Sequence, residues 1–293
     1  MVSPVSNPVL RADLHSHSNV SDGTTTPADV ISRAAAAGLD VIALTDHDTV
    51  AGHAEAATAL PAGLTLLPGM ELSCRLQGHS VHLLSYLFDP ASPELAAETA
   101  KIRESRVTRA REMVRRLADQ GIPVTWEQVA DIADGGVVGR PHIARALAAA
   151  GVVASPADAF SPDWIGPGGP AYVARYALEP VRAVTLVRAA GGVTVLAHPR
   201  GYGRGWQIPD DVIAELAAAG LTGLEINHPQ HDEVAREELR ALAAALGLVP
   251  SGGSDDHGEL TGFRLGTETA PPGSYQRLIE PATGGTPIVG HEP

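Results

Sequence analysis

Residues 26–48 read TPADVISRAAAAGLDVIALTDHD, and this stretch sets the pattern for most of the chain. Thr26 suits the N-cap of a helix, Pro27 suits the first helical position, and Gly38 ends the helical pattern. The apolar run 41–44 that follows is short, so we expect a buried strand there. A helix followed by a buried strand is the repeating unit of an α/β protein.

The same alternation recurs along much of the chain. Apolar runs typical of strands end near residue 14 and occupy 41–44, 64–67, 81–87, 193–197, 223–226 and 248–251, and the run 81–87 is expected to form a hairpin with 72–76. Alternating strands and helices predict a parallel sheet or barrel. We therefore predict an α/β fold, a TIM-like barrel built from residues 1–90 and 179–267.

A helical insertion is predicted to interrupt this barrel at residues 91–178. Helical periodicity extends from about residue 94 to 151, and a Pro- and Gly-rich connection follows at 155–170. The arginine run at 103–116 is interpreted as a solvated helix face. The tail at 268–293 is also rich in Pro and Gly, so we expect it to be irregular.

The composition excludes several classes of protein. The chain has 293 residues and one cysteine, Cys74, which excludes internal disulfides and a cysteine zinc finger. We find no uninterrupted apolar run of about 18 residues and no signal peptide, so we expect a cytoplasmic protein without a membrane partner. The net charge of −13 argues against a large basic surface for duplex DNA. The 12 histidines and the single lysine, Lys101, are unusual for such a chain.

Histidines and carboxylates gather at the predicted strand ends. Residues i and i+2 of a strand point the same way, so His15 and His17, or Asp255 and His257, can face one metal ion. The carboxyl ends of parallel strands share one face of a barrel, and burying many ionisable groups there without a cation would be costly. The sequence therefore predicts a site for several metal ions, built from the histidines and carboxylates at 15–22, 46–48, 71, 82, 198 and 255–257.

The combined motifs resemble the PHP (polymerase and histidinol phosphatase) family of metal-dependent phosphoesterases. The resemblance is carried by DLHSH at 13–17, TDHD at 45–48, AHP at 197–199 and SDDH at 254–257, together with Glu71 and His82. The insertion, with GRPH at 139–142, is similar to the branch that acts on AMP and 3′,5′-bisphosphonucleotides or trims RNA 5′ ends.

The resemblance implies a distorted (β/α)7 barrel that holds three divalent ions. The first ion would be held by His15, His17, Glu71 and Asp255, the second by Glu71 as a bridge with His82 and His198, and the third by Asp22, His47 and His257. Imidazole and carboxylate ligands suit Mn, Fe or Zn. Two such ions about 3.5–4 Å apart can hold a hydroxide that attacks phosphorus, so we expect a phosphoric ester hydrolase.

Further residues are candidates for substrate binding and catalysis. Arg140 and His142 would flank a helix N-terminus, which attracts phosphate, and Arg140 is also a catalytic candidate. Arg200 and Arg204 are additional phosphate contacts. His228 follows the strand 223–226 and is a candidate leaving-group acid, substrate contact or support for a ligand.

Other functions remain open at this point. Many binuclear amidohydrolases use a carboxylated lysine as the bridge, but Lys101 lies in a helical stretch, so Glu71 is the better bridge here. A histidinol-phosphate-type phosphatase and a non-catalytic metal-binding module are further alternatives. The sequence leaves open the oligomeric state and the choice among mononucleotide, bisphosphonucleotide and RNA substrates.

Overall fold

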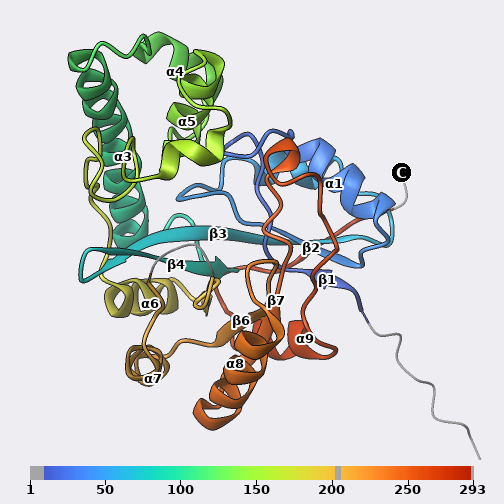
Figure 1. Ribbon diagram of the computed structural model, residues 1–293. Helices are drawn as coiled ribbons and strands as arrows, with labels where there is room; N and C mark the ends of the chain where they lie inside the picture. The colour runs from blue at the N-terminus through green and yellow to red at the C-terminus, as the bar shows by residue number, and fades with distance from the viewer. Residues whose placement is uncertain (1–9, 202–205, 292–293) are drawn as a thin grey trace, which may run out of the picture.

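A nearly closed barrel of seven strands forms the centre of the computed structural model, which describes residues 10–201 and 206–291 (Figure 1). Neighbouring strands follow one another in chain order: β1 (Ala12–Asp13), β2 (Val41–Leu44), β3 (Thr65–Leu76), β4 (His79–Tyr86), β5 (Val193–Leu196), β6 (Gly223–Asn227) and β7 (Val249–Gly252). Two backbone hydrogen bonds join β1 to the β7 side, from Leu14 N–H to the Gly252 carbonyl (3.2 Å) and from Asp255 N–H to the His15 carbonyl (2.8 Å). The predicted barrel class is therefore confirmed.

The barrel is mixed, because β4 runs antiparallel to both of its neighbours while the other consecutive pairs are parallel. At this strand the sheet departs from the parallel pattern in the way that a hairpin requires. Gln77 and Gly78, both at positive φ, turn the chain directly from β3 into β4, and so short a connection can only join antiparallel strands. The predicted hairpin is present, and β3 unites the two apolar runs 64–67 and 72–76 in one strand.

The interior of the barrel changes from apolar to polar along its strands. On β4, Tyr86 and Leu84 belong to the buried apolar cluster inside the barrel, and His82 and Ser80 continue the same face toward the hairpin. The apolar residues stabilise the barrel by their burial, while the polar end of the same face opens at its mouth.

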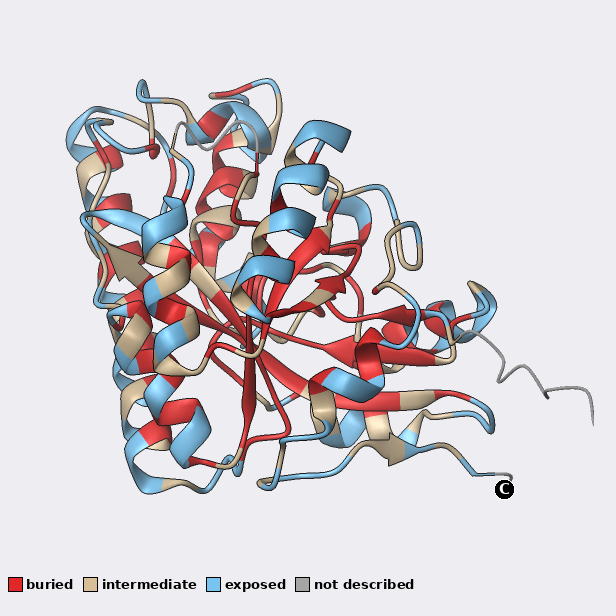
Figure 2. Cartoon of the chain, turned by 90° about the horizontal axis from the view of Figure 1, so that it is seen from below, coloured by how far each residue is buried: buried red, intermediate tan, exposed pale blue. Residues whose placement is uncertain are grey.

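Helices surround the barrel, with their buried stripes toward the strands and their outer faces exposed (Figure 2). They are α1 (Pro27–Ala36), α2 (His53–Thr58), α6 (Pro180–Ala189), α7 (Asp210–Ala219) and α8 (Glu233–Leu246). The predicted start of α1 is confirmed, because the Thr26 side chain accepts a hydrogen bond from Asp29 N–H and Pro27 occupies the first helical position. Within the described ranges, none of the helices is both long enough and apolar enough to cross a membrane.

The segment between β4 and α6 forms a helical layer beside the barrel (Figure 1). It contains α3 (Pro93–Asp119), α4 (Trp126–Ala133), α5 (Arg140–Ala149) and a short 3-10 helix (Pro156–Phe160). Its apolar cluster is separate from those of the barrel and includes Met113, Leu117, Val129, Ile143 and Leu147. The limits 91–178 remain a prediction.

The prediction of an irregular tail is wrong in two places. A short helix, α9 (Ser274–Ile279), packs Tyr275 and Leu278 into the cluster inside the barrel. The strand β8 (Ile288–Val289) pairs antiparallel with β3. Both elements depend on contacts with the barrel, which the local Pro and Gly content does not reveal.

Candidate metal centre

The predicted ligands converge at the mouth of the barrel. Four sets of side chains offer ligand atoms within 4.8 Å of one another: His15, His17, Glu71 and Asp255; His17, Asp22, His47 and His257; His47, Glu71 and His82; and His15, Glu225 and His228. His198 lies outside these sets, but its Nε2 is 3.0 Å from Glu71 Oε1. The structure thus brings all nine predicted ligands together, and their binding of metal remains a prediction.

The first set has the donor chemistry of a cation site. His15 Nε2 and His17 Nε2 face each other at 3.2 Å, and each lies 3.1–3.4 Å from Glu71 Oε2 and Asp255 Oδ1. All four side chains are buried. Neutral imidazole lone pairs and carboxylate oxygens that point at one position suit a divalent ion.

The second set surrounds Asp22. Its oxygens lie 3.3 Å from His257 Nε2 and 3.7 Å from His47 Nε2. Nδ1 of His17 and Nδ1 of His47 are buried, and neither has a hydrogen-bond partner within the described ranges. Because an unpaired buried polar atom costs about 1–3 kcal/mol, these two atoms also fit a bound cation.

Glu71 lies between the sets, in the place expected of a ligand that bridges two ions. Its Oε1 is 2.7 Å from His82 Nδ1, whereas its Oε2 faces the imidazoles of His15, His17 and His47. His82 reaches Glu71 from within the antiparallel β4, where it pairs with Ser73, as expected from its place in the alternating run 81–87.

The ionisation of the site agrees with this arrangement. Burial alone would raise the pKa of Glu71, but the imidazoles of His47, His82 and His15 hold it well below its usual value. Burial lowers the pKa of His47 to about 3, which leaves its ring neutral. Burial also disfavours protonated His17, but hydrogen bonds to Asp255 and Glu71 outweigh it and raise the pKa to about 10. The carboxylates of Asp255 and Glu71 therefore favour a positive charge beside His17.

Glu225, on β6, is a buried part of the site that sequence reasoning missed. One carboxylate oxygen lies 3.0 Å from His15 Nδ1, and the other accepts the His198 N–H at 2.7 Å. A carboxylate on Nδ1 orients an imidazole so that Nε2 faces the metal. The available signal was an acid in the middle of the otherwise apolar strand 223–226.

Asp46 and His228 support the same cluster. Asp46 accepts hydrogen bonds from Ser18 N–H (2.8 Å) and the Ser21 hydroxyl (2.6 Å), which holds the loop that carries Asp22. His228 is fully buried, and its Nδ1 accepts the Gln230 N–H at 3.0 Å. Its Nε2 can therefore donate to Asp255 Oδ2, 3.2 Å away.

The four residues predicted to contact phosphate differ in their surroundings. Arg140 begins α5 and lines a hollow beside the barrel. His142 is buried, and its Nδ1 accepts the Gly139 N–H at 2.9 Å. The Arg200 guanidinium bonds to Asp210 and to the Ile208 carbonyl in its own loop. Arg204 lies outside the described residues.

The arginine run of α3 is not simply the solvated face that we expected. Arg106 is 6% exposed because its guanidinium bonds to Asp48 Oδ2 and to the Ser73 hydroxyl, each at 2.7 Å. Arg109 is 8% exposed. Lys101, in contrast, lies on the exposed side of α3 and pairs with Glu98, so it does not supply a carboxylated bridge.

Comparisons with known proteins agree with the geometry. Residues 13–124 match the PHP domain. The chain is 38% identical over 264 residues to the 3′,5′-nucleoside bisphosphate phosphatase of Chromobacterium violaceum, covering 89% of this chain and 92% of that protein. It is 34% identical over 246 residues to a 5′-3′ exoribonuclease of Haemophilus influenzae, covering 84% and 89%. A structure from Bifidobacterium adolescentis, described as a candidate metal-dependent phosphoesterase, matches with a TM-score of 0.87 and 33% identity over 94% of this chain and 98% of that one.

Proposed function

Because this chain belongs to the PHP-domain phosphoesterases, we propose that it hydrolyses phosphate esters of small nucleotides, namely AMP or 3′,5′-bisphosphonucleotides. The observation that carries the proposal is the buried set of imidazole nitrogens and carboxylate oxygens that converge on Glu71. Removal of nucleotides from RNA 5′ ends is the second candidate, and it is favoured by the similarity to the exoribonuclease.

The first ion would be held by His15, His17, Glu71 and Asp255, the second by Glu71, His82 and His198, and the third by Asp22, His47 and His257. Divalent Mn, Fe or Zn bound there would supply Lewis acidity and an activated water for attack at phosphorus. Glu71 orients both sides of the cluster, and Glu225 holds His15 in the productive tautomer.

His228 is proposed as a hydrogen-bond donor to the leaving group. The Gln230 N–H occupies its Nδ1, so the ring is neutral and its proton lies on Nε2, beside Asp255. When the P–O bond breaks, this N–H would stabilise the charge on the leaving oxygen, which takes its proton from water. His228→Gln should then slow the hydrolysis of AMP far more than that of p-nitrophenyl phosphate, whose leaving group needs no proton. An equal loss with both substrates would remove this role.

The proposed function is tested with purified protein of measured metal content, supplied with Mn²⁺. Phosphate release is compared for AMP, 3′,5′-bisphosphoadenosine, histidinol phosphate and a short RNA with a 5′ phosphate, and RNA shortening is followed on a gel. Turnover of a nucleotide or of the RNA supports the proposal. Turnover of histidinol phosphate alone, or of none of the four with metals bound, refutes it.

A further inference from the structure

Asp255 enters the metal centre with its backbone in the left-handed region, at a φ of +50°. Residues with a Cβ atom rarely adopt this region, and aspartate enters it most easily when its own side chain bonds to the nearby backbone. The carboxylate of Asp255 is engaged elsewhere. Its Oδ1 faces the imidazoles of His15 and His17, and its Oδ2 faces His228. Other groups must therefore hold the peptide at this position.

The carbonyl oxygen of Asp255 accepts two hydrogen bonds. Arg264 Nη2 donates one at 2.7 Å, and His257 Nδ1 donates the other at 3.0 Å. Because a carbonyl can only accept, the His257 ring carries a proton on Nδ1 and turns Nε2 toward Asp22, 3.3 Å away. One carbonyl thus orients a predicted ligand of the first ion and a predicted ligand of the third.

The guanidinium of Arg264 is directed at Asp255. Nη2 also lies 3.8 Å from Asp255 Oδ2, and within the described ranges no other carboxylate lies within 4.0 Å of this guanidinium. The Arg264 side chain is only 23% exposed, so it packs beside the loop that carries the ligand. A charged donor makes a stronger hydrogen bond than a neutral one, which suits this contact to holding a peptide in an unfavourable conformation.

Asp256 sets the course of the loop that carries Arg264. This carboxylate is 1% exposed. Its Oδ1 accepts the Arg264 N–H at 2.6 Å and the Thr261 hydroxyl at 3.1 Å. Its Oδ2 accepts the Gly258 N–H at 3.0 Å. These bonds fold the loop back on itself, so that the Arg264 side chain returns to the peptide immediately before Asp256.

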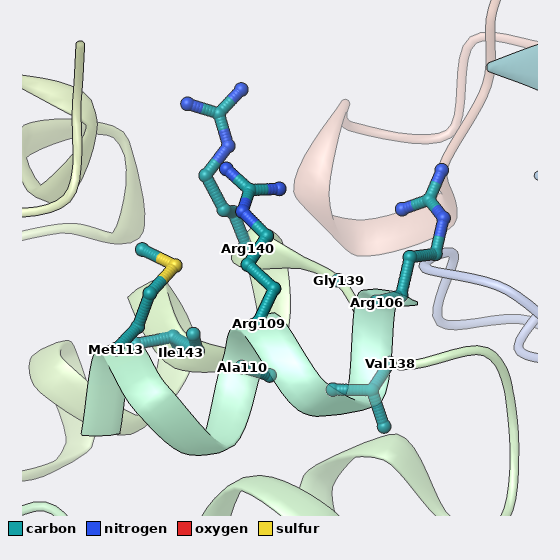
Figure 3. A pocket seen from close by; sticks show the side chains of 8 residues that line it. All are labelled: Arg106, Arg109, Ala110, Met113, Val138, Gly139, Arg140 and Ile143. Carbon is teal, nitrogen blue, oxygen red and sulfur yellow. The ribbon is translucent and has the colours of Figure 1, made fainter. Parts of the chain in front are cut away.

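A similar arrangement is present at a second loop of the mouth. Asp48 follows the predicted ligand His47 and has a φ of +57°. Its carbonyl accepts a hydrogen bond from Arg103 at 2.8 Å, and its carboxylate accepts one from Arg106 at 2.7 Å. The side chain of Arg106 is set apart from that of Arg109 on the same helix (Figure 3). Arginine donors thus hold left-handed aspartates in two loops that carry predicted ligands.

We propose that Arg264 and Asp256 are positioning residues of the metal centre. Arg264 holds the Asp255 peptide in the left-handed conformation that aims its carboxylate into the site, and Asp256 holds Arg264 in place. The inference rests on the proposed function, since it takes Asp255 as a metal ligand, and it adds the residues on which the geometry of that ligand depends.

The first test measures the Mn²⁺ affinity of metal-depleted protein by competition with a chelator. Arg264→Met removes the donor but keeps an unbranched side chain, and it should weaken binding about 10–100-fold. Arg264→Lys retains a cationic donor and should recover part of the affinity. Arg33→Met is the matched control, because the Arg33 guanidinium stacks on the Phe263 ring of the same loop at 4.1 Å. This control should bind Mn²⁺ as the wild type does.

The outcomes separate the inference from the proposed function. Wild-type affinity in folded Arg264→Met overturns the inference alone, and so does a loss in Arg264→Lys as large as that in Arg264→Met. A wild-type protein that binds no Mn²⁺ overturns the ligand set and the inference with it. Bound Mn²⁺ without turnover of any substrate overturns only the proposed function, and a lower affinity of Arg264→Met then still supports the inference.

The second test asks whether Asp256 acts through Arg264. Asp256→Asn replaces one carboxylate oxygen with NH2, so at least one of its three donors loses its acceptor. The Mn²⁺ affinity should fall about tenfold. Adding Asp256→Asn to Arg264→Met should cause little further loss, because the group through which Asp256 acts is already absent. Losses that multiply overturn the coupling, and unchanged affinity in Asp256→Asn overturns the inference even if Arg264→Met does not fold.

Discussion

Glu225→Gln isolates the contribution of one buried carboxylate to the metal centre. Glutamine nearly preserves the size and shape of the side chain. The carboxylate of Glu225 contacts His15 Nδ1 at 3.0 Å and the His198 N–H at 2.7 Å. An amide has one acceptor oxygen and one NH2 donor, so it can accept only one of these two hydrogen bonds. The other donor then faces an NH2 group in a fully buried position.

The expected loss follows from these contacts. Removing a carboxylate that orients a metal-binding imidazole lowers metal affinity about 10–100-fold, which corresponds to about 1.4–2.8 kcal/mol. The assay titrates Mn²⁺ into metal-depleted protein against a competing chelator. Glu215→Gln, at an exposed position on α7, is the control. Unchanged Mn²⁺ affinity in folded Glu225→Gln would refute the supporting role of this carboxylate.

Three further predictions concern the site and its surroundings. His47→Ala should lower the rate of phosphate release more than about a hundredfold, because a predicted metal ligand is lost. His291→Ala, in the exposed tail, is the control and should leave this rate unchanged. Equal rates for His47→Ala and the wild type would contradict the proposed ligand set. Asp48→Asn should lower the free energy of unfolding by about 3–5 kcal/mol, since Arg106 then stays buried without its partner; denaturant unfolding measures this, and adding Arg106→Met should restore part of the loss. Burial lowers the pKa of His53 below 6.5 in the folded chain. As the pH falls from about 7 to 5, this histidine therefore binds more protons in the unfolded chain than in the folded one, and the free energy of unfolding decreases. His53→Gln should weaken the pH dependence of the thermal midpoint over this range, and a profile parallel to that of the wild type would argue against it.

Local signals were sufficient for much of the fold. The helix that starts at Thr26 and Pro27 needs only a cap and an apolar stripe, and the strand 41–44 that follows is recognised by its apolar run. The antiparallel direction of β4 follows from the hairpin predicted between 72–76 and 81–87, whereas the alternation along the rest of the chain indicates a parallel sheet. The tail was misjudged because α9 and β8 are stabilised by contacts with distant residues.

The sequence by itself determined that histidines and carboxylates gather at the barrel mouth, because strand periodicity sets the side to which His15 and His17 point and strand ends meet there. The choice of nine ligands among them followed from the resemblance to the PHP family. Only the tertiary structure decided the contacts of Glu225 and Arg106. Whether a carboxylate orients an imidazole, or an arginine is paired, depends on which charges other segments bring within a few ångströms. The sequence predicted a solvated arginine face, and the packing of the helical layer against the barrel instead buried Arg106 against Asp48 and Ser73.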